Sequence, residues 1–266
     1  MNSYGVSKQE EQVSLHVTEI LRLGYTTLKN IVPSEICKEA RQRLDNVYLR
    51  QIDEFGNQNL LQIKENDMAR LPLTYDPWFF YFLQLEEVNK LLTYFLGKYH
   101  ILSLQNGIIN QPGTKHHQTS WHRDLPYQNW VCSQPLAINA MICIDNFNEE
   151  TGGTYVLPHS HRFEKFPPAD FIQDHETCVH ADSGCVILFD AMLYHRAGSN
   201  VSKNIRRGIN HMFSIPIIKQ QISIPRALED AGIIPPDNLK RILGFNDVEP
   251  DSVLKWRNNR LNRQQK

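Results

Sequence analysis

The 266-residue sequence lacks any closely spaced cysteine pair. Its five cysteines are Cys37, Cys132, Cys143, Cys178 and Cys185. An odd number of cysteines at wide spacing argues against a disulfide framework and against a cysteine zinc site. We therefore expect free thiols and a reducing, cytoplasmic compartment.

The sequence also lacks a long hydrophobic run and an excess of charge. No apolar stretch approaches the roughly 18 residues of a membrane-spanning helix, and the polar residues 1–12 do not read as a signal peptide. The formal net charge is -1, so no strongly basic field would attract nucleic acid. We expect a small-molecule substrate, no nucleic acid and no membrane as partners, and the oligomeric state stays open.

The pattern of apolar residues predicts one domain over residues 1–266, mainly β with accessory helices. Helices are expected from Pro33-Ser34-Glu35 onward and from Asp76-Pro77 to Gly97. Strands are expected at 101–110, 136–145, 154–157, 185–190 and 209–215. Short strands between Gly, Pro and Asn turns are typical of a sandwich or barrel, a group that includes jelly rolls. The ends, about 1–15 and 255–266, are expected to be flexible, and the basic run 255–263 to form a solvated, partly helical tail.

Two His-x-Asp triplets occur, His122-Arg123-Asp124 and His180-Ala181-Asp182. On an extended segment, the first and third side chains of such a triplet share one face and can bind one ion together. Iron(II) enzymes that activate dioxygen commonly hold the metal with two His and one carboxylate, which leaves positions open. A third ligand must therefore come from a distant part of the chain.

Spacing favours the first triplet. His195 follows 71 positions after Asp124, which is enough chain for three strands that leave and return. It follows only 13 positions after Asp182, and a single strand fills that gap. We predict a metal site at His122, Asp124 and His195, and we interpret His180 and Asp182 as surface turn residues.

Arg206 lies 11 positions after His195, at the start of the next expected strand. A guanidinium group offers a two-pronged hydrogen-bond donor to a carboxylate. A dicarboxylate cosubstrate could therefore touch the metal at one end and Arg206 at the other. Arg207 is the near alternative, but strand alternation would turn its side chain the other way.

These residues, in this order, resemble the phytanoyl-CoA hydroxylase family of iron(II)/2-oxoglutarate dioxygenases, and in particular its ectoine hydroxylase-like bacterial members. The resemblance rests on Trp121-His122-Arg123-Asp124, on the series from Glu150 to Arg162, on His195 to Asn200 and on Arg206-Arg207. It runs from about Gly24 to Pro216. It implies a double-stranded β-helix (jelly roll, cupin-like) core with N-terminal helices packed on one sheet.

The resemblance also implies roles for single residues. His122, Asp124 and His195 would bind Fe(II), and Arg206 would bind the distal carboxylate of the cosubstrate 2-oxoglutarate. Two further positions, Gln105 and Thr154, would contact that cosubstrate. The expected activity is hydroxylation of a small, polar metabolite or biosynthetic intermediate with O2, releasing succinate and CO2.

Three residues qualify that picture. Halogenating relatives carry a small residue at the carboxylate position, so Asp124 favours hydroxylation. Many relatives carry a hydroxyl residue where this chain has Ala197, and His159 replaces the Gly of the family's Pro-Gly-Ser-His turn. The resemblance therefore leaves one auxiliary cosubstrate contact open.

Other functions compete for the same residues. His122-Arg123-Asp124-Leu125 imitates a protein-kinase catalytic loop, but no Gly-rich phosphate loop precedes it and no Asp-Phe-Gly follows. A jelly-roll metal-dependent isomerase or epimerase, or a non-catalytic metal-binding protein, remains the alternative. The sequence does not identify the substrate, because function is not read from fold.

Overall fold

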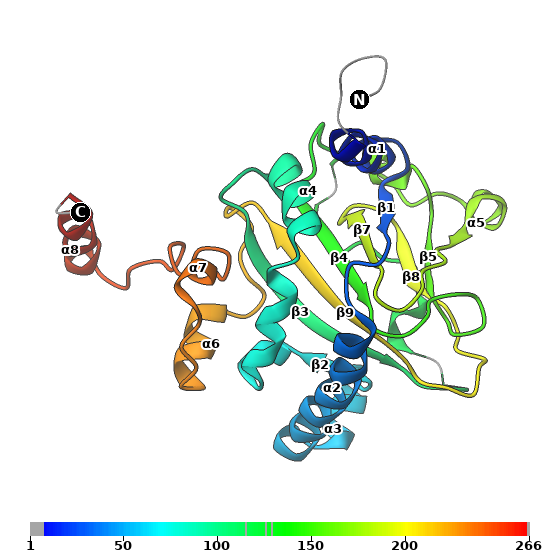
Figure 1. The fold of residues 1–266 in the computed structure, drawn as a ribbon, viewed down its shortest axis with the longest axis horizontal. Helices are drawn as coiled ribbons and strands as arrows, with labels where there is room; N and C mark the ends of the chain where they lie inside the picture. Colours follow the sequence, from blue (N-terminus) through cyan, green and yellow to red (C-terminus); the bar gives the residue numbers. More distant parts are fainter. Residues whose placement is uncertain (1–7, 115, 126, 129, 265–266) are drawn as a thin grey trace.

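Two antiparallel β-sheets form the centre of the computed structural model, which describes residues 8–114, 116–125, 127–128 and 130–264 (Figure 1). In spatial order, the six strands of the larger sheet are β1 (Tyr25–Leu28), β7 (Val186–Asp190), β4 (Ala137–Cys143), β9 (Arg206–Ser214), β3 (Ile101–Asn110) and β2 (Met68–Arg70). The smaller sheet contains β6 (Thr177–Cys178), β5 (Thr154–Val156) and β8 (His195–Ala197). The chain is therefore a mixed helix and sheet protein, and each of the five strands expected from the sequence is present.

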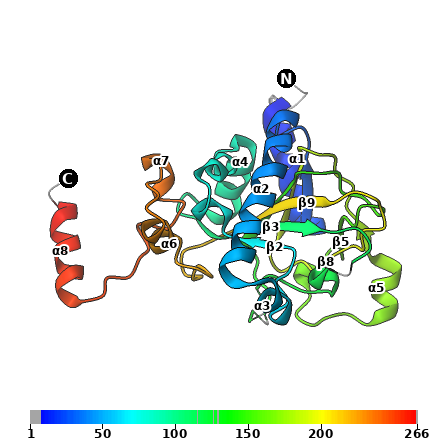
Figure 2. The same cartoon turned by 90° about the horizontal axis from the view of Figure 1, so that it is seen from below.

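Helices cover the outer face of the larger sheet, as Figures 1 and 2 show. The main ones are α1 (Lys8–Leu23), α2 (Ser34–Phe55) and α4 (Glu86–Leu96). In α2, the side chains of Cys37, Ala40, Leu44 and Val47 recur at helical spacing and are buried in the core. The helix predicted from Ser34 is thus confirmed, and its apolar stripe attaches it to the sheet.

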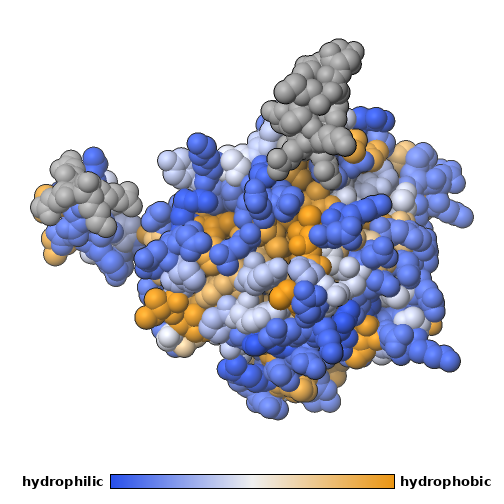
Figure 3. Space-filling view, viewed as in Figure 1, coloured by the Kyte–Doolittle hydropathy of each residue, from blue (hydrophilic) through white to orange (hydrophobic). Residues whose placement is uncertain are grey.

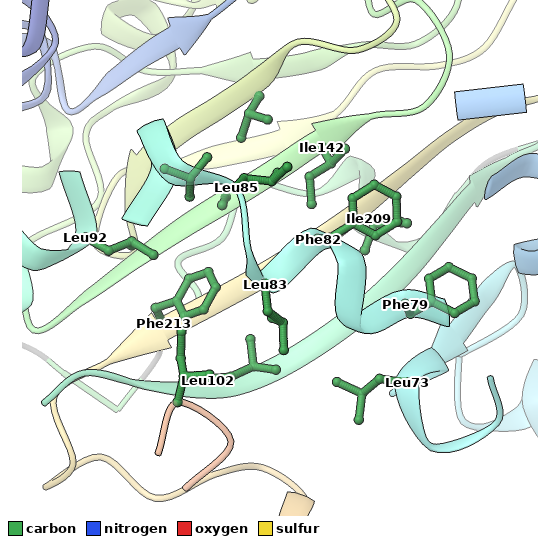
Figure 4. Close-up of a cluster of buried hydrophobic side chains, with 14 of the residues drawn as sticks. Leu73, Phe79, Phe82, Leu83, Leu85, Leu92, Leu102, Ile142, Ile209 and Phe213 are labelled. Carbon is green, nitrogen blue, oxygen red and sulfur yellow. The ribbon is translucent and has the colours of Figure 1, made fainter. Parts of the chain in front are cut away.

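The helix predicted from Asp76 to Gly97 is split in two. A 3-10 segment, η2 (Pro77–Leu83), is followed by Leu85 in an extended conformation, and α4 begins only at Glu86. Both predicted ends are correct, because Asp76 accepts a hydrogen bond from the Trp78 backbone N–H and Gly97 ends α4 at φ 78°. Phe79, Phe82 and Leu83 of η2 are all buried in the core between this segment and the sheet, as Figure 4 shows.

The remaining helical segments are short, apart from the last one. They are α3 (Asn57–Gln62), α5 (Ala169–His175), α6 (Ile224–Asp230), α7 (Asp237–Lys240), α8 (Val253–Gln264) and the 3-10 turns η1 (Pro72–Thr74), η3 (His117–Thr119) and η4 (Ser160–Arg162). The basic tail is helical in α8, which projects away from the sheets and exposes hydrophilic and hydrophobic side chains (Figures 1 and 3). At the other end, residues 1–7 of the expected flexible segment lie outside the described residues.

Side chains of β9 alternate between the two faces of the larger sheet. Ile209 and Phe213 belong to the helix-covered core, and Arg207 pairs with Asp45 of α2. Arg206, by alternation, therefore faces the smaller sheet. We call this side of the larger sheet the inner face.

A second core fills the space between the sheets. Met141 and Phe189 of the larger sheet pack with Val156 of the smaller one, together with Phe147 and Leu193. This core attaches the small sheet to the inner face. Its apolar side chains exclude water from the space that they fill. Among the described helices, none has the length and apolar character needed to cross a membrane.

A buried histidine in β9 predicts how stability depends on pH. His211 is fully buried, and its Nε2 accepts a hydrogen bond from Gln105 Nε2 at 2.7 Å. Burial lowers the pKa of His211 from 6.5 to about 3, so the unfolded chain binds a proton that the folded chain does not. Stability is therefore retained above about pH 6.5 and lost as the pH falls toward 3, by roughly 2 kcal/mol at pH 5.

Urea unfolding at pH 7 and pH 5 measures this effect. We expect His211→Gln to lose about 2 kcal/mol less than the wild type over that interval. His180→Gln is the matched control, since the His180 side chain is 65% exposed, and it should keep the wild-type dependence. An identical pH dependence in wild type and His211→Gln would contradict the prediction.

Candidate metal centre

The backbone brings His122 and His195 side by side. The two residues form an antiparallel bridge, with His122 N–H donating to His195 O at 3.0 Å and His195 N–H donating to His122 O at 3.1 Å. Asp124 N–H donates to Ala191 O at 3.1 Å. The extended segment 122–124 therefore lies along β8, on the side away from β5. The chain leaves after Asp124, forms four strands, one more than the three expected, and returns to the same point.

The three side chains converge on one point. His122 Nε2 lies 3.8 Å from Asp124 Oδ1, and His195 Nε2 lies 3.7 Å from Asp124 Oδ2. One ligand atom from each residue lies within 4.8 Å of the other two. His195 is 8% exposed and His122 is 31% exposed, so the centre is open on the His122 side.

The hydrogen bonds around this centre suit a bound cation. His122 Nδ1 is 2.9 Å from Ser120 O, and His195 Nδ1 is 2.9 Å from Leu193 O. Both Nδ1 atoms therefore carry the proton, and both Nε2 atoms keep a lone pair toward Asp124. Asp124 Oδ2 is buried and has no hydrogen-bond partner among the described residues. Two neutral imidazoles and one carboxylate in this arrangement fit an iron(II) ion.

Arg206 is the second unusual group of the inner face. Its side chain is 2% exposed, its guanidinium lies 4.4 Å from the Phe147 ring centroid, and its Nη2 donates to Gly152 O at 2.6 Å. Its Nε has no partner, and in the described part of the chain no carboxylate is paired with it. Burial lowers the pKa of Arg206 to about 10, which leaves the group charged at neutral pH. A buried cation without an anion is costly, so this position suits a carboxylate from a ligand.

Gly152 and His116 are two further residues near Arg206. Gly152, which accepts from Arg206, has φ 70°, and a Cβ there would lie 2.6 Å from both Asn110 Nδ2 and Gly198 O. His116 is buried, and burial is the main cause that lowers its pKa to about 3, with added contributions from the charges of Arg206 and His122. The charges of Arg206 and His122 therefore both act on His116.

Comparisons with known proteins agree with this geometry. The family model described as phytanoyl-CoA dioxygenase (PhyH) matches residues 20–208. The chain belongs to the phytanoyl-CoA dioxygenase family. Uncharacterized proteins of Mycobacterium tuberculosis and Mycobacterium bovis are both 33% identical to it over 232 residues, which cover 84% of this chain and 83% of each relative. A protein of Talaromyces verruculosus named dioxygenase cdmD is 27% identical over 121 residues, covering 44% of this chain and 38% of the relative.

Solved structures show the same fold. The non-heme monooxygenase ThoJ superposes with a TM-score of 0.63 at 15% identity, covering 77% of this chain and 79% of that chain. The epimerase SnoN, solved with Fe3+, alpha ketoglutarate and nogalamycin RO, superposes with a TM-score of 0.57 at 15% identity, covering 77% and 84% of the two chains. Membership in the phytanoyl-CoA dioxygenase family supports an oxygenase of the iron- and 2-oxoglutarate-dependent kind, and such enzymes act on small molecules.

Gln105 does not lie where its expected role requires. It pairs in register with His211, so its side chain faces the helices, where Oε1 accepts from Leu73 N–H at 2.8 Å. Arg206 lies on the opposite face of the same sheet. A cosubstrate held by Arg206 therefore does not contact Gln105. The neighbouring Asn106 faces inward instead, as does Asn110, which pairs with Arg206 in register.

Thr154 lies on the face that its expected role requires. It pairs in register with Ala197, two positions after His195, and its side chain is buried on the side of Val156. Alternation along β5 and β8 thus places Thr154, Ala197 and His195 on one face between the sheets. A contact between Thr154 and the cosubstrate stays a prediction.

Two histidines of the loops around the metal centre are buried. His116 and His161 are 1% and 9% exposed. Burial lowers the pKa of His161 to about 4, and its Nε2 lies 3.3 Å from Leu21 O. His159, which replaces the family's Gly, has φ 69°, the left-handed conformation that glycine would adopt without strain.

Arg123 has a structural role that the sequence did not show. Its side chain is 8% exposed and donates to Met192 O at 2.9 Å and Ser160 O at 3.0 Å, with its guanidinium 4.0 Å from the Tyr194 ring centroid. It therefore links the metal segment to the 160–164 turn. By contrast, the side chains of Tyr127 and Trp130, which follow the metal segment, are 65% and 49% exposed.

The second His-x-Asp triplet forms no such centre. His180 is exposed and bonds Glu149 Oε1 at 2.8 Å, and Asp182 is exposed. A different group, Glu149, Cys178 and His180, does gather there near the surface. The described residues thus agree with the interpretation of His180 and Asp182 as surface turn residues.

Proposed function

We propose that this chain is an Fe(II)- and 2-oxoglutarate-dependent dioxygenase that hydroxylates a small, polar metabolite or biosynthetic intermediate with O2. The observation that carries the proposal is a buried, unpaired guanidinium, Arg206, facing the same inter-sheet space as an open His122, Asp124 and His195 centre. One end of that space suits a metal and the other suits a carboxylate, which together match a keto-dicarboxylic acid. We also propose that the two sheets form a jelly-roll core, and that the five free thiols reflect a cytoplasmic protein.

Each residue would have a defined task. His122 and His195 present Nε2 because Ser120 O and Leu193 O accept their Nδ1 protons, and Asp124 contributes the only charged ligand. Arg206 would receive the distal carboxylate and fix the orientation of the cosubstrate, while the Phe147 ring shields the guanidinium from water. Bound iron would supply oxygen activation coupled to decarboxylation of the cosubstrate to succinate and CO2.

The proposal predicts a spectroscopic and a chemical result. Fe(II) and 2-oxoglutarate added to the protein without oxygen should give a weak visible charge-transfer band, because the keto acid then binds the metal directly. Oxygen should then release succinate, and a screened substrate should gain one oxygen atom by mass spectrometry.

The same measurement separates the alternatives. A product of unchanged mass would favour an epimerase or isomerase over a hydroxylase. A protein that binds iron but gives neither the band nor succinate would be a metal-binding protein without this activity.

A further inference from the structure

Two asparagines lie side by side on the inner face of the larger sheet. Asn139 belongs to β4 and Asn210 to the adjacent β9, and the side chains are 0% and 7% exposed. Asn210 Nδ2 donates to Asn139 Oδ1 at 3.2 Å. The alternating neighbours Ile138, Ala140 and Ile209 belong to the helix-covered core, so both carboxamides point toward the smaller sheet.

Each carboxamide keeps one atom without a partner. Asn139 Nδ2 and Asn210 Oδ1 are both buried and make no hydrogen bond to the described residues. Exchanging the oxygen and nitrogen of both side chains would give the same result, because the mutual bond always uses one donor and one acceptor. The pair therefore offers one donor and one acceptor next to each other, whichever orientation is chosen.

Phe189 connects the pair with the metal centre. Asn139 pairs in register with Phe189 of β7, and the Phe189 ring centroid is 4.7 Å from that of His195. Asn210 pairs in register with Asn106 on one side and Met141 on the other. On the same face of β9, Asn210 is separated from Arg206 by Gly208. The pair is thus a polar position distinct from the carboxylate site at Arg206.

We propose that Asn139 and Asn210 form a binding subsite for one neutral hydroxyl or amide group of the substrate; this inference rests on the proposed function. A hydroxyl or an amide can accept from one carboxamide and donate to the other at once. A carboxylate has no proton to give the free oxygen, so it matches only half of the pair. Buried polar atoms without partners destabilise a fold, and their presence beside an active centre is explained by a ligand that completes them.

The test replaces both side chains by leucine, which has a similar shape. The Asn139→Leu/Asn210→Leu variant should unfold at a higher temperature than the wild type, by about 3–8 °C, because two unpaired buried groups are removed. The charge-transfer band with Fe(II) and 2-oxoglutarate, and the slow succinate release without substrate, should stay within about two-fold of wild type. The matched control is Ser103→Ala/Ser214→Ala, since those buried hydroxyls bond each other at 2.5 Å and should give no rise in temperature.

The probes are methyl glucoside and its monodeoxy derivatives, each of which lacks one hydroxyl of a neutral ring. In the wild type, loss of one particular hydroxyl should reduce the acceleration of succinate release by about ten-fold or more, because the pair is then left incomplete. In the double leucine variant, loss of any one hydroxyl should leave the acceleration of succinate release unchanged.

Three results would overturn the subsite. The first is an unfolding temperature that stays the same or falls, which would show that the pair is complete in the folded protein, by itself or with a trapped water. The second is a loss of 2-oxoglutarate affinity in the double variant, which would assign the pair to the cosubstrate. The third is a wild type that does not distinguish the deoxy derivatives. Failure of the proposed function is separate, because it would appear as a wild type without the band and without succinate.

Discussion

Replacing Asp124 by alanine should abolish succinate release and weaken Fe(II) binding by more than about 100-fold. Changes in residues that only orient metal ligands cost about 10–100-fold in metal affinity or activity, and Asp124 is itself the charged ligand. Its Oδ2 is already buried and unpaired, so the alanine variant loses an atom that contributes no hydrogen bond to the described fold. Iron titration and succinate release measure the two effects, and circular dichroism checks the fold.

The second triplet supplies the control for this experiment. Asp182→Ala removes the carboxylate of the other His-x-Asp motif, which is exposed and does not belong to the His122, Asp124 and His195 group. This variant should keep wild-type iron affinity and turnover. Equal losses in Asp124→Ala and Asp182→Ala would contradict the assignment of the metal to the first triplet.

Replacing Arg206 by methionine should raise the dissociation constant for 2-oxoglutarate by about 100-fold or more. Two charge-assisted hydrogen bonds to a carboxylate contribute roughly 1.5–3 kcal/mol each. The folded protein should be at least as stable as before, because removing a buried cation without an anionic partner relieves a desolvation cost. The charge-transfer band, titrated with 2-oxoglutarate, measures the affinity.

The adjacent residue provides a matched comparison. Arg207 faces the helices and pairs with Asp45 at 2.8 Å and Asp145 at 3.4 Å. Arg207→Met should therefore lower the free energy of unfolding by about 1–3 kcal/mol and leave 2-oxoglutarate affinity unchanged. If Arg207→Met weakened 2-oxoglutarate binding and Arg206→Met lowered the free energy of unfolding instead, Arg207 and not Arg206 would face the cosubstrate.

The metal centre could be predicted from the sequence because its signal is local and its spacing is restrictive. A His-x-Asp pair defines two ligands on one strand face, and the 71 positions between Asp124 and His195 leave enough chain for a return to the same point. Strand alternation likewise predicted that Arg206 and Arg207 point to opposite faces of the sheet, so that only one of them could face the metal centre. Family resemblance then supplied the chemistry that these positions suggest.

Other parts could not be predicted, and Gln105 shows why. Nearly every residue of β3 is buried, so the segment 101–110 has no polar face that would fix which residues point inward. A one-residue error in such a strand moves the side chain to the opposite face, and β3 has an irregularity between Leu102 and Leu104. Asn139 and Asn210 were missed because a polar residue within a strand usually indicates a solvent-exposed face. The split of the helix at Leu85 depended on packing of η2 against a sheet that lies later in the chain.

The paired backbone bonds between His122 and His195 have a consequence for how the protein is made. The ligands are held by a bridge between His122 and His195, which are 73 positions apart, so a nascent chain that ends before residue 195 contains two ligands but no centre. Contacts between residues so far apart in the sequence form slowly. The chain loses the entropy of the long loop before the contact between its two ends contributes any favourable free energy. Iron capture should therefore follow completion of the domain, and the metal would be loaded after translation of β8.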